Sequence, residues 1–320
     1  MDSILGTKEI YKKLFPLSIV CFLVELVGLA FVFAGPVVGF FIGRSGDNAL
    51  VGLIVGFIVG VLLAMIYHTF VSTIFHSGFI AVISKTIVNN KIPDKIFSEA
   101  LKESKSRFSS VITFFLVSSA IRGTVSSIND SITRVSGRIG GSVASGISSA
   151  ISSGINTMLN YLSDCCLAWI FYKKDLKTGK AAIEGVAVFF KHKQALFANA
   201  KRIFLTGLIS FVSIAGVFFG IYFLILYLNP NISTAVSNAI VNSFNNVDPA
   251  LASNVLFPII FSLVLAIFTW AIIHSAFVRP FVLIGVIREF MIAGIKDKPT
   301  EEEIIKAKDM SPKLNKIADK

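Results

Sequence analysis

The stretch AGPVVGFFIGRSGDNALVGLIVGFIVG (residues 34–60) decides the fold of this chain. It carries glycines four residues apart on both sides of a short polar segment at 44–48. Residues four apart share one face of a helix, and small ones let two backbones approach closely. The flanking apolar runs, 15–43 and 49–77, exceed the roughly 20 helical residues that cross a hydrocarbon core of about 30 Å. We therefore predict a tight membrane hairpin. Its glycine faces pack within the chain or, alternatively, form a dimer face.

The composition extends this prediction to the whole chain. Of its 320 residues 54% are hydrophobic and 15% are charged, and the mean hydropathy is +0.77. Globular domains average about 45–50% apolar and about 25% charged residues. Backbone groups in lipid must bond within helices or a closed barrel, and these continuous runs lack the alternation of barrel strands. We predict an all-α polytopic membrane bundle over 1–293 with about six transmembrane helices. The expected spans are 15–43, 49–77, 108–128, 155–172, 204–228 and 254–278.

The basic residues indicate an orientation in the membrane. The formal net charge is +11, from 30 Lys and Arg against 19 Asp and Glu. With the N-terminus inside, nearly all Lys and Arg fall on the cytoplasmic side, and the exceptions are Arg44, Arg122, Arg134 and Arg138. This is the positive-inside bias of membrane proteins. We expect both termini and the tail at 294–320 to be cytoplasmic. The positive charge then faces anionic headgroups rather than nucleic acid.

Two cytoplasmic segments repeat one pattern. Residues 89–108 (NNKIPDKIFSEALKESKSRF) and 173–204 each run from a basic turn through an amphipathic helix into the next span. We predict cytoplasmic amphipathic surface helices, with Phe189, Phe190 and Leu196 of the second segment in the membrane interface. The expected lipid-headgroup contacts are Lys191, His192, Lys193, Lys201 and Arg202.

Two further segments carry local signals. In RIGGSVASGISSAISSGIN (138–156) isoleucines and small residues recur four apart, which favours a helix over a flexible Gly/Ser linker. The sequence does not indicate whether 124–154 lies inside the bilayer. In the tail, Thr300 followed by Glu303 forms a capping box, so we expect a short helix to begin there.

Polar residues inside the predicted spans are the candidates for function. Glu25 lies near the middle of the first span, where a charge costs about 2.5–3.5 kcal/mol. It either binds a proton or cation, or is neutral and bonded to a neighbour. Asp164 lies in the fourth span and can pair with a histidine or occupy a shallow aqueous pocket. The candidate substrate- or ion-binding residues are Glu25, His68, His76, Asp164, His274 and Ser275.

The motifs FHSGF (75–79) and IHSAF (273–277) come near the end of two apolar runs. A helix from Ala49 to His76 is about 40 Å long at 1.5 Å per residue, which exceeds the hydrocarbon core. Trp270 comes one turn before His274, and Arg279 follows. Both motifs therefore mark helix exits, or they converge as a cytoplasmic gate or headgroup site. His68 lies deeper than His76.

The sequence lacks the common motifs of nucleotide-binding and hydrolytic sites. It contains no phosphate loop, HExxH, nucleophile elbow or dinucleotide fingerprint. The cysteines Cys21, Cys165 and Cys166 fall in predicted spans and give neither a disulfide framework nor zinc spacing. We expect no catalytic residue, metal or cofactor. A lipid-modifying enzyme that uses His68, His76 or His274 is the least favoured class.

From the fourth span onward the chain resembles the choline-transporter-like membrane proteins. The segments that carry the resemblance are 160–174 (NYLSDCCLAWIFYKK), 181–204, 270–291 (WAIIHSAFVRPFVLIGVIREFM) and 311–317 (SPKLNKI). The resemblance implies transport of choline-like or other small solutes, and His274 and Ser275 match in position. The Gly/Ser stretch departs from the family, and the large extracellular loop of its eukaryotic members is missing. A small prokaryotic membrane family of unknown function is equally similar.

Two functions follow as expectations. The first is a transporter of a small solute or lipid headgroup that does not hydrolyse ATP. The alternative is a non-catalytic accessory subunit or scaffold that binds anionic lipid. Expected partners are the lipid bilayer, a small solute, and a second copy or a larger membrane complex, but no nucleic acid. A transporter should gather Glu25, His68 and Asp164 around one cavity, whereas a scaffold should leave each bonded separately.

Overall fold

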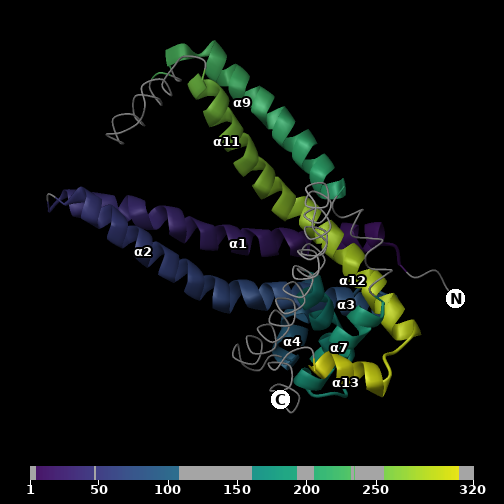
Figure 1. The fold of residues 1–320 in the computed structure, drawn as a ribbon. Helices are drawn as coiled ribbons and strands as arrows, with labels where there is room; N and C mark the ends of the chain where they lie inside the picture. Colours follow the sequence, from purple (N-terminus) through teal and green to yellow (C-terminus); the bar gives the residue numbers. More distant parts are fainter. Residues whose placement is uncertain are drawn as a thin grey trace, which may run out of the picture. The chain divides into compact units, whose positions relative to one another are not determined.

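The computed structural model describes residues 5–46, 48–107, 161–192, 205–231, 234 and 256–309 (Figure 1). Within these residues all regular structure is helical, which confirms the all-α prediction. Three of the described helices are long and apolar enough to cross a membrane: Thr7–Arg44, Leu205–Leu228 and Phe257–Lys296. These helices are consistent with a membrane-embedded protein. The predicted count of about six is not confirmed, and the predicted span at 108–128 and the helix at 138–156 lie outside the described residues.

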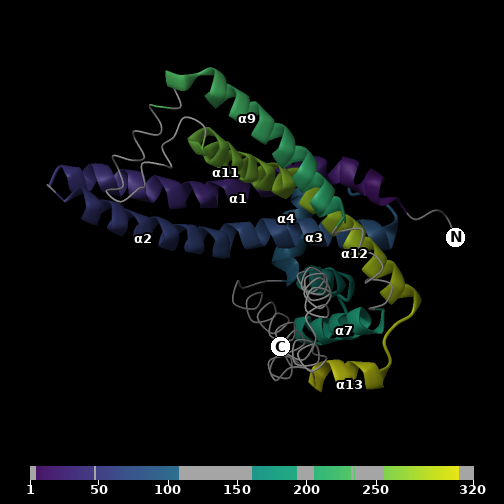
Figure 2. The same cartoon turned by 45° about the horizontal axis from the view of Figure 1, so that its top comes forward.

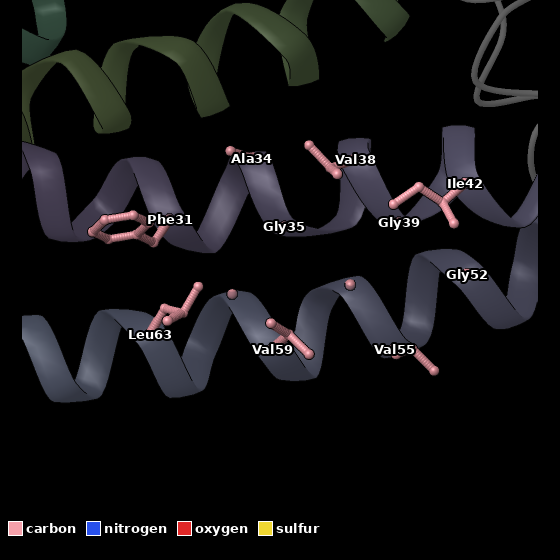
Figure 3. Close-up of a pocket in the computed structure, with 12 residues that line it drawn as sticks. Phe31, Ala34, Gly35, Val38, Gly39, Ile42, Gly52, Val55, Val59 and Leu63 are labelled. Atoms are coloured by element: carbon pink, nitrogen blue, oxygen red, sulfur yellow. The ribbon is translucent and has the colours of Figure 1, made fainter.

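The first two long helices form a hairpin. Helix α1 (Thr7–Arg44) and helix α2 (Ala49–Tyr67) lie side by side in both views (Figures 1 and 2). The turn between them is closed by a hydrogen bond from Asn48 N to Gly43 O of 2.9 Å. A Cβ atom added to Gly35 would lie 2.8 Å from the Cα of Gly60, closer than real Cβ atoms approach. The helices therefore touch backbone to backbone (Figure 3), so the glycines of 34–60 pack within the chain.

The hairpin divides into an exposed and a packed part. Large apolar side chains are exposed from Leu23 to Ile42 on α1 and from Val51 to Ile66 on α2. The exposed stretch of α1 covers about 20 residues, or about 30 Å, the thickness of a hydrocarbon core. Nearer the N-terminus, α1 instead buries Ile10, Leu14 and Leu17 against the rest of its unit. One helix thus has a lipid-compatible half and a protein-packed half.

The packed part of this unit is a bundle of short helices that we call the head. It contains α1 residues 7–18, α3 (Thr73–Asn89), α4 (Ile96–Arg107), the helix at 161–172, α7 (Thr178–Lys191), α12 (Arg279–Lys296) and α13 (Glu301–Asp309). At its centre the Trp169 ring packs edge-on against Phe290, with ring centroids 5.9 Å apart. Gly294 lies so close to Val188 that an added Cβ would meet its Cγ1 atom at 2.6 Å.

Residues 202–279 form a second unit. Its helices are α9 (Gly216–Leu228) and α11 (Leu256–Ile273), which lie side by side (Figure 2). The hydroxyls of Tyr222 and Thr269 share a hydrogen bond of 2.9 Å between these helices. Trp270 Nε1 donates to Ser210 Oγ at 3.4 Å. The helices of this unit are thus joined by polar contacts along an otherwise apolar interface.

Short π-helical turns interrupt the described long helices. They are η1 (His68–Ser72), η2 (Phe211–Ala215) and η4 (His274–Val278). Both η1 and η4 begin at a histidine and continue directly into a helix of the head, α3 or α12. Helix α3 is followed by a turn and the short helix α4, and α12 is followed by a turn and the short helix α13. The helix at 161–172 is followed by a turn and α7 in the same way.

One of the expected surface helices, α7, differs from the prediction. Helix α7 is buried from residue 181 to 189, and Phe189 is only 3% exposed, so its apolar face lies in the head rather than in a membrane interface. Gly185 makes this close packing possible, because an added Cβ would meet Trp169 Cβ at 3.2 Å. Helix α4 turns Glu103 and Ser104 inward, while Phe97 and Leu101 are exposed.

Candidate functional site

His76 and Asp164 form a pair between two helices of the head. His76 lies on α3 and Asp164 on the helix at 161–172, and His76 Nε2 lies 3.0 Å from Asp164 Oδ1. The side chains are 27% and 14% exposed, so both retain some contact with the surroundings. A carboxylate that holds an imidazole in this way fixes the orientation of the ring. The sequence indicated that Asp164 could pair with a histidine, and the structure identifies His76 as that histidine.

The pair lies where the exposed part of the hairpin meets the head. Cys21 Sγ donates a hydrogen bond to Phe75 O at 3.6 Å, which places His76 near the start of the packed half of α1. The neighbouring residue, Ser77, is buried and bonded to Ser104 of α4, with 2.5 Å between the two Oγ atoms. The FHSGF motif thus joins α3 to three other helices: α1, α4 and the helix at 161–172. Helix α3 continues through the motif to Asn89.

Glu25 and His68 lie farther along the hairpin. Gly28 packs near the Tyr67 ring, at 3.3 Å between an added Cβ and Cδ1, so η1 lies alongside this part of α1. His68 begins that π turn, and Glu25 is half-buried nearby on α1. Along the helix axis His68 and His76 are about 12 Å apart at 1.5 Å per residue. His68 is therefore set apart from the His76–Asp164 pair along the hairpin.

The α1–α2 hairpin carries a groove that is lined by residues other than these candidates. A groove of about 380 Å³ runs along α1 and α2 and is lined by glycines and apolar side chains (Figure 3). Its lining residues are Phe31, Ala34, Gly35, Val38, Gly39, Ile42, Gly52, Val55, Gly56, Val59, Gly60 and Leu63. Glu25, His68 and Asp164 are not among them. The groove therefore offers no polar group to a charged solute.

A charge network that the sequence did not reveal holds α4 to the rest of the head. Lys174 Nζ contacts both carboxylate oxygens of Glu103, at 2.6 and 2.7 Å, and Lys85 contacts Glu99 and Glu103. Burial raises the pKa of the Glu103 carboxyl, but Lys174 and Lys85 outweigh this effect and lower it overall. The hydrogen bond to Glu99 raises the pKa of Lys85. No spacing could signal this network, because its members come from three elements.

Two of the predicted headgroup residues are bonded to the C-terminal segment. Lys191 Nζ lies 2.8 Å from Asp297 Oδ1 and 3.4 Å from Glu303 Oε2, and it donates to Lys298 O at 2.7 Å. His192 Nε2 lies 3.0 Å from Asp297 O. We call these contacts the α13 latch. Lys193, Lys201 and Arg202, the other predicted headgroup residues, lie outside the described part of the chain.

The second motif lies in the other unit. His274 begins η4 and packs on Trp270, with ring centroids 5.2 Å apart and planes inclined at 41°. Ser275 is half-buried in the same turn. The Trp270 ring also meets Phe211 edge-on at 5.0 Å. His274 therefore belongs to an aromatic cluster where η2 packs on the end of α11.

The described residues include no group of three or more His, Cys, Asp or Glu side chains placed to hold a metal ion. The strongest chemical arrangement among them is the His76–Asp164 pair. No protein-family model, curated protein or solved structure matches the chain.

Proposed function

We propose that this protein is a multi-pass membrane protein that serves as a non-catalytic accessory subunit or scaffold, with its head on the cytoplasmic side. The observation that carries the proposal is the way the candidate polar residues are used. Asp164 is bonded to His76 within the head, and the groove of the hairpin is apolar. A packed head joined to lipid-compatible helices suits a protein that presents a folded surface at a membrane.

The charge distribution supports the orientation. Exposed lysines of the head include Lys12, Lys13, Lys102 and Lys180, whereas the described tip of the α1–α2 hairpin carries one basic residue, Arg44. Lys and Arg accumulate on the cytoplasmic side of membrane proteins. The head is therefore the cytoplasmic part, and the hairpin tip reaches the opposite surface.

The His76–Asp164 pair favours a second candidate, a proton-linked transporter. The pair lies where the exposed part of the hairpin ends, and both of its side chains remain partly exposed. In such a transporter Asp164 would carry the proton or a cationic solute of the choline type.

Proteoliposomes that contain a pH-sensitive dye separate the two functions. The purified chain is reconstituted, a pH gradient is applied, and internal pH is followed with and without choline. The scaffold proposal expects the rate of protein-free liposomes for both the wild type and Asp164→Asn. A flux that the wild type supports and Asp164→Asn abolishes would establish transport instead. For the scaffold, extraction in mild detergent should give a native complex larger than the 34.7 kDa chain in its micelle.

A further inference from the structure

Arg279 is a charged residue in unusually apolar surroundings. Among the described residues of the unit 202–279 there is no Asp, Glu or Lys, and Arg279 is exposed at the end of η4. A guanidinium is always charged and has five N–H donors, so at a membrane boundary it needs an anion or water. No carboxylate in the described part of its own unit can supply one.

The position of Arg279 along the helix matches the edge of the hydrocarbon core. Exposed apolar side chains begin on this helix at Ile259 and recur through Phe268 to Phe277. From Ile259 to Arg279 the helix covers about 20 residues, or about 30 Å. An arginine at this depth extends its side chain toward the phosphate layer.

The π turn aligns Arg279 with an aromatic pair. The Arg279 N–H donates to His274 O across five residues, which is the bond that defines a π turn. In an unbroken α-helix, at 100° per residue, Arg279 would point about 140° away from His274. The extra residue in the turn brings Arg279 back toward the face that carries His274 and, one turn earlier, Trp270. The three side chains thus form a row that leads from the apolar part of the helix to its edge.

We propose that Trp270, His274 and Arg279 form a binding site for the phosphate of an anionic lipid headgroup. The proposal rests on the membrane function above and adds the ligand class to it. Arg279 would bind two phosphate oxygens through its fork of donors, and a ring N–H of His274 would supply a further contact. The Trp270 N–H is used by Ser210, so Trp270 would contribute its ring rather than a hydrogen-bond donor to the lipid contact. Lys191 and His192, the residues first expected in this role, are engaged by the α13 latch.

Native mass spectrometry of the full chain with added lipid tests this site. The wild type, Arg279→Gln and Arg44→Gln are titrated with phosphatidylglycerol and with phosphatidylcholine of equal chain length. Arg44 is the matched control, since it is also exposed at the end of a membrane helix but lacks the aromatic row. We expect the wild type and Arg44→Gln to prefer phosphatidylglycerol, and Arg279→Gln to bind it about ten-fold more weakly. Arg279→Lys should recover part of the affinity, because the charge remains while the fork is lost.

Any of the following results would overturn the proposal. One is equal phosphatidylglycerol binding by wild type and Arg279→Gln at the same melting temperature. Another is displacement of the lipid by millimolar inorganic phosphate, which would indicate a soluble phosphate ligand. The third is a loss in Arg44→Gln as large as in Arg279→Gln. If no lipid of either class binds, the membrane function itself fails; if both classes bind equally, only the headgroup site fails.

Discussion

At the scale of single residues, the head depends on a carboxylate that its helix turns inward. Glu103 is 7% exposed at its side chain and meets Lys174 and Lys85, which come from two other elements. A buried charge without such partners would be strongly destabilising. Glu103 therefore accounts for the orientation of α4, which buries its polar edge and leaves Phe97 and Leu101 outside.

Replacing Glu103 with Gln should lower the free energy of unfolding by about 1–2 kcal/mol at pH 7, since Lys174 is largely exposed and can rehydrate. The pKa of Glu103 is lowered in the folded state. Its contribution is therefore present above the ordinary carboxyl value of 4.5 and is lost as the pH falls through the folded-state value. Chemical denaturation in detergent at pH 7 and at pH 3 should show a gap between wild type and variant that closes in acid. Glu302→Gln, which removes an exposed pair with Lys306, should change stability by less than about 0.5 kcal/mol.

At the scale of elements, the α1–α2 hairpin was predictable and α7 was not. Glycines four residues apart on both sides of a short turn leave few arrangements other than close antiparallel helices. The capping box at Thr300 likewise predicted α13, and Thr300 and Glu303 make its reciprocal bonds. By contrast, α7 has apolar residues that suit a membrane surface and a protein core equally well. Only tertiary contact with Trp169, across the turn at 173–177, decides between them. The π turns were also invisible, because one extra residue in a turn leaves no mark in an apolar run.

Substituting Gly39 with Ala should loosen the hairpin. An added Cβ would lie 2.8 Å from the Cα of Gly56, and that backbone cannot move without separating the helices. We expect a loss of about 1–3 kcal/mol, the usual cost of overpacking. Gly220→Ala on α9 is the control, since nothing lies within 4 Å of its added Cβ. Melting temperatures in one detergent compare the two variants; equal values would argue against backbone contact in the hairpin.

The α13 latch should respond to charge. The hydrogen bond to Asp297 raises the pKa of Lys191, and the same bond lowers the pKa of Asp297. The latch is therefore complete between the two folded-state values. It weakens as acid protonates Asp297 or as alkali above the ordinary lysine value of 10.5 deprotonates Lys191. Lys191→Gln should speed hydrogen exchange in α13 at pH 7, and high salt should do the same to wild type. Lys306→Gln should leave exchange near the wild-type rate, and equal acceleration in both variants would contradict the latch.

At the scale of the whole molecule, composition and charge predicted a helical membrane protein, and the three long apolar helices are consistent with this. The candidate site was predictable only in part. Asp164 and His76 stood out as polar residues in apolar runs, but their pairing depends on how α3 packs on the helix at 161–172. The existence of a packed head was missed, because the segment at 161–172 has the sequence of a membrane span and differs from one only in what covers it. Leu162, Leu167 and Ile170, for example, are covered by protein.

Labelling from outside sealed vesicles tests the orientation. Single cysteines are introduced into a Cys21→Ala background at three positions that are exposed in the structure: Gly46, Lys102 and Lys180. The remaining native cysteines, Cys165 and Cys166, are buried. In right-side-out vesicles a membrane-impermeant maleimide should label Gly46→Cys and should reach the other two only after permeabilisation. Labelling of Lys102→Cys from one side of the membrane and of Lys180→Cys from the other would contradict a head that lies on one side.

The backbone contact of the hairpin also restricts how this gene can diverge. Any single-base change in a glycine codon that alters the residue inserts a side chain, and therefore a Cβ, where two main chains already touch. Substitutions can accumulate at the lipid-facing valines and isoleucines between these positions with little consequence. Relatives of this chain that have lost all other identity should still show six glycines in two runs of three, at Gly35, Gly39, Gly43, Gly52, Gly56 and Gly60.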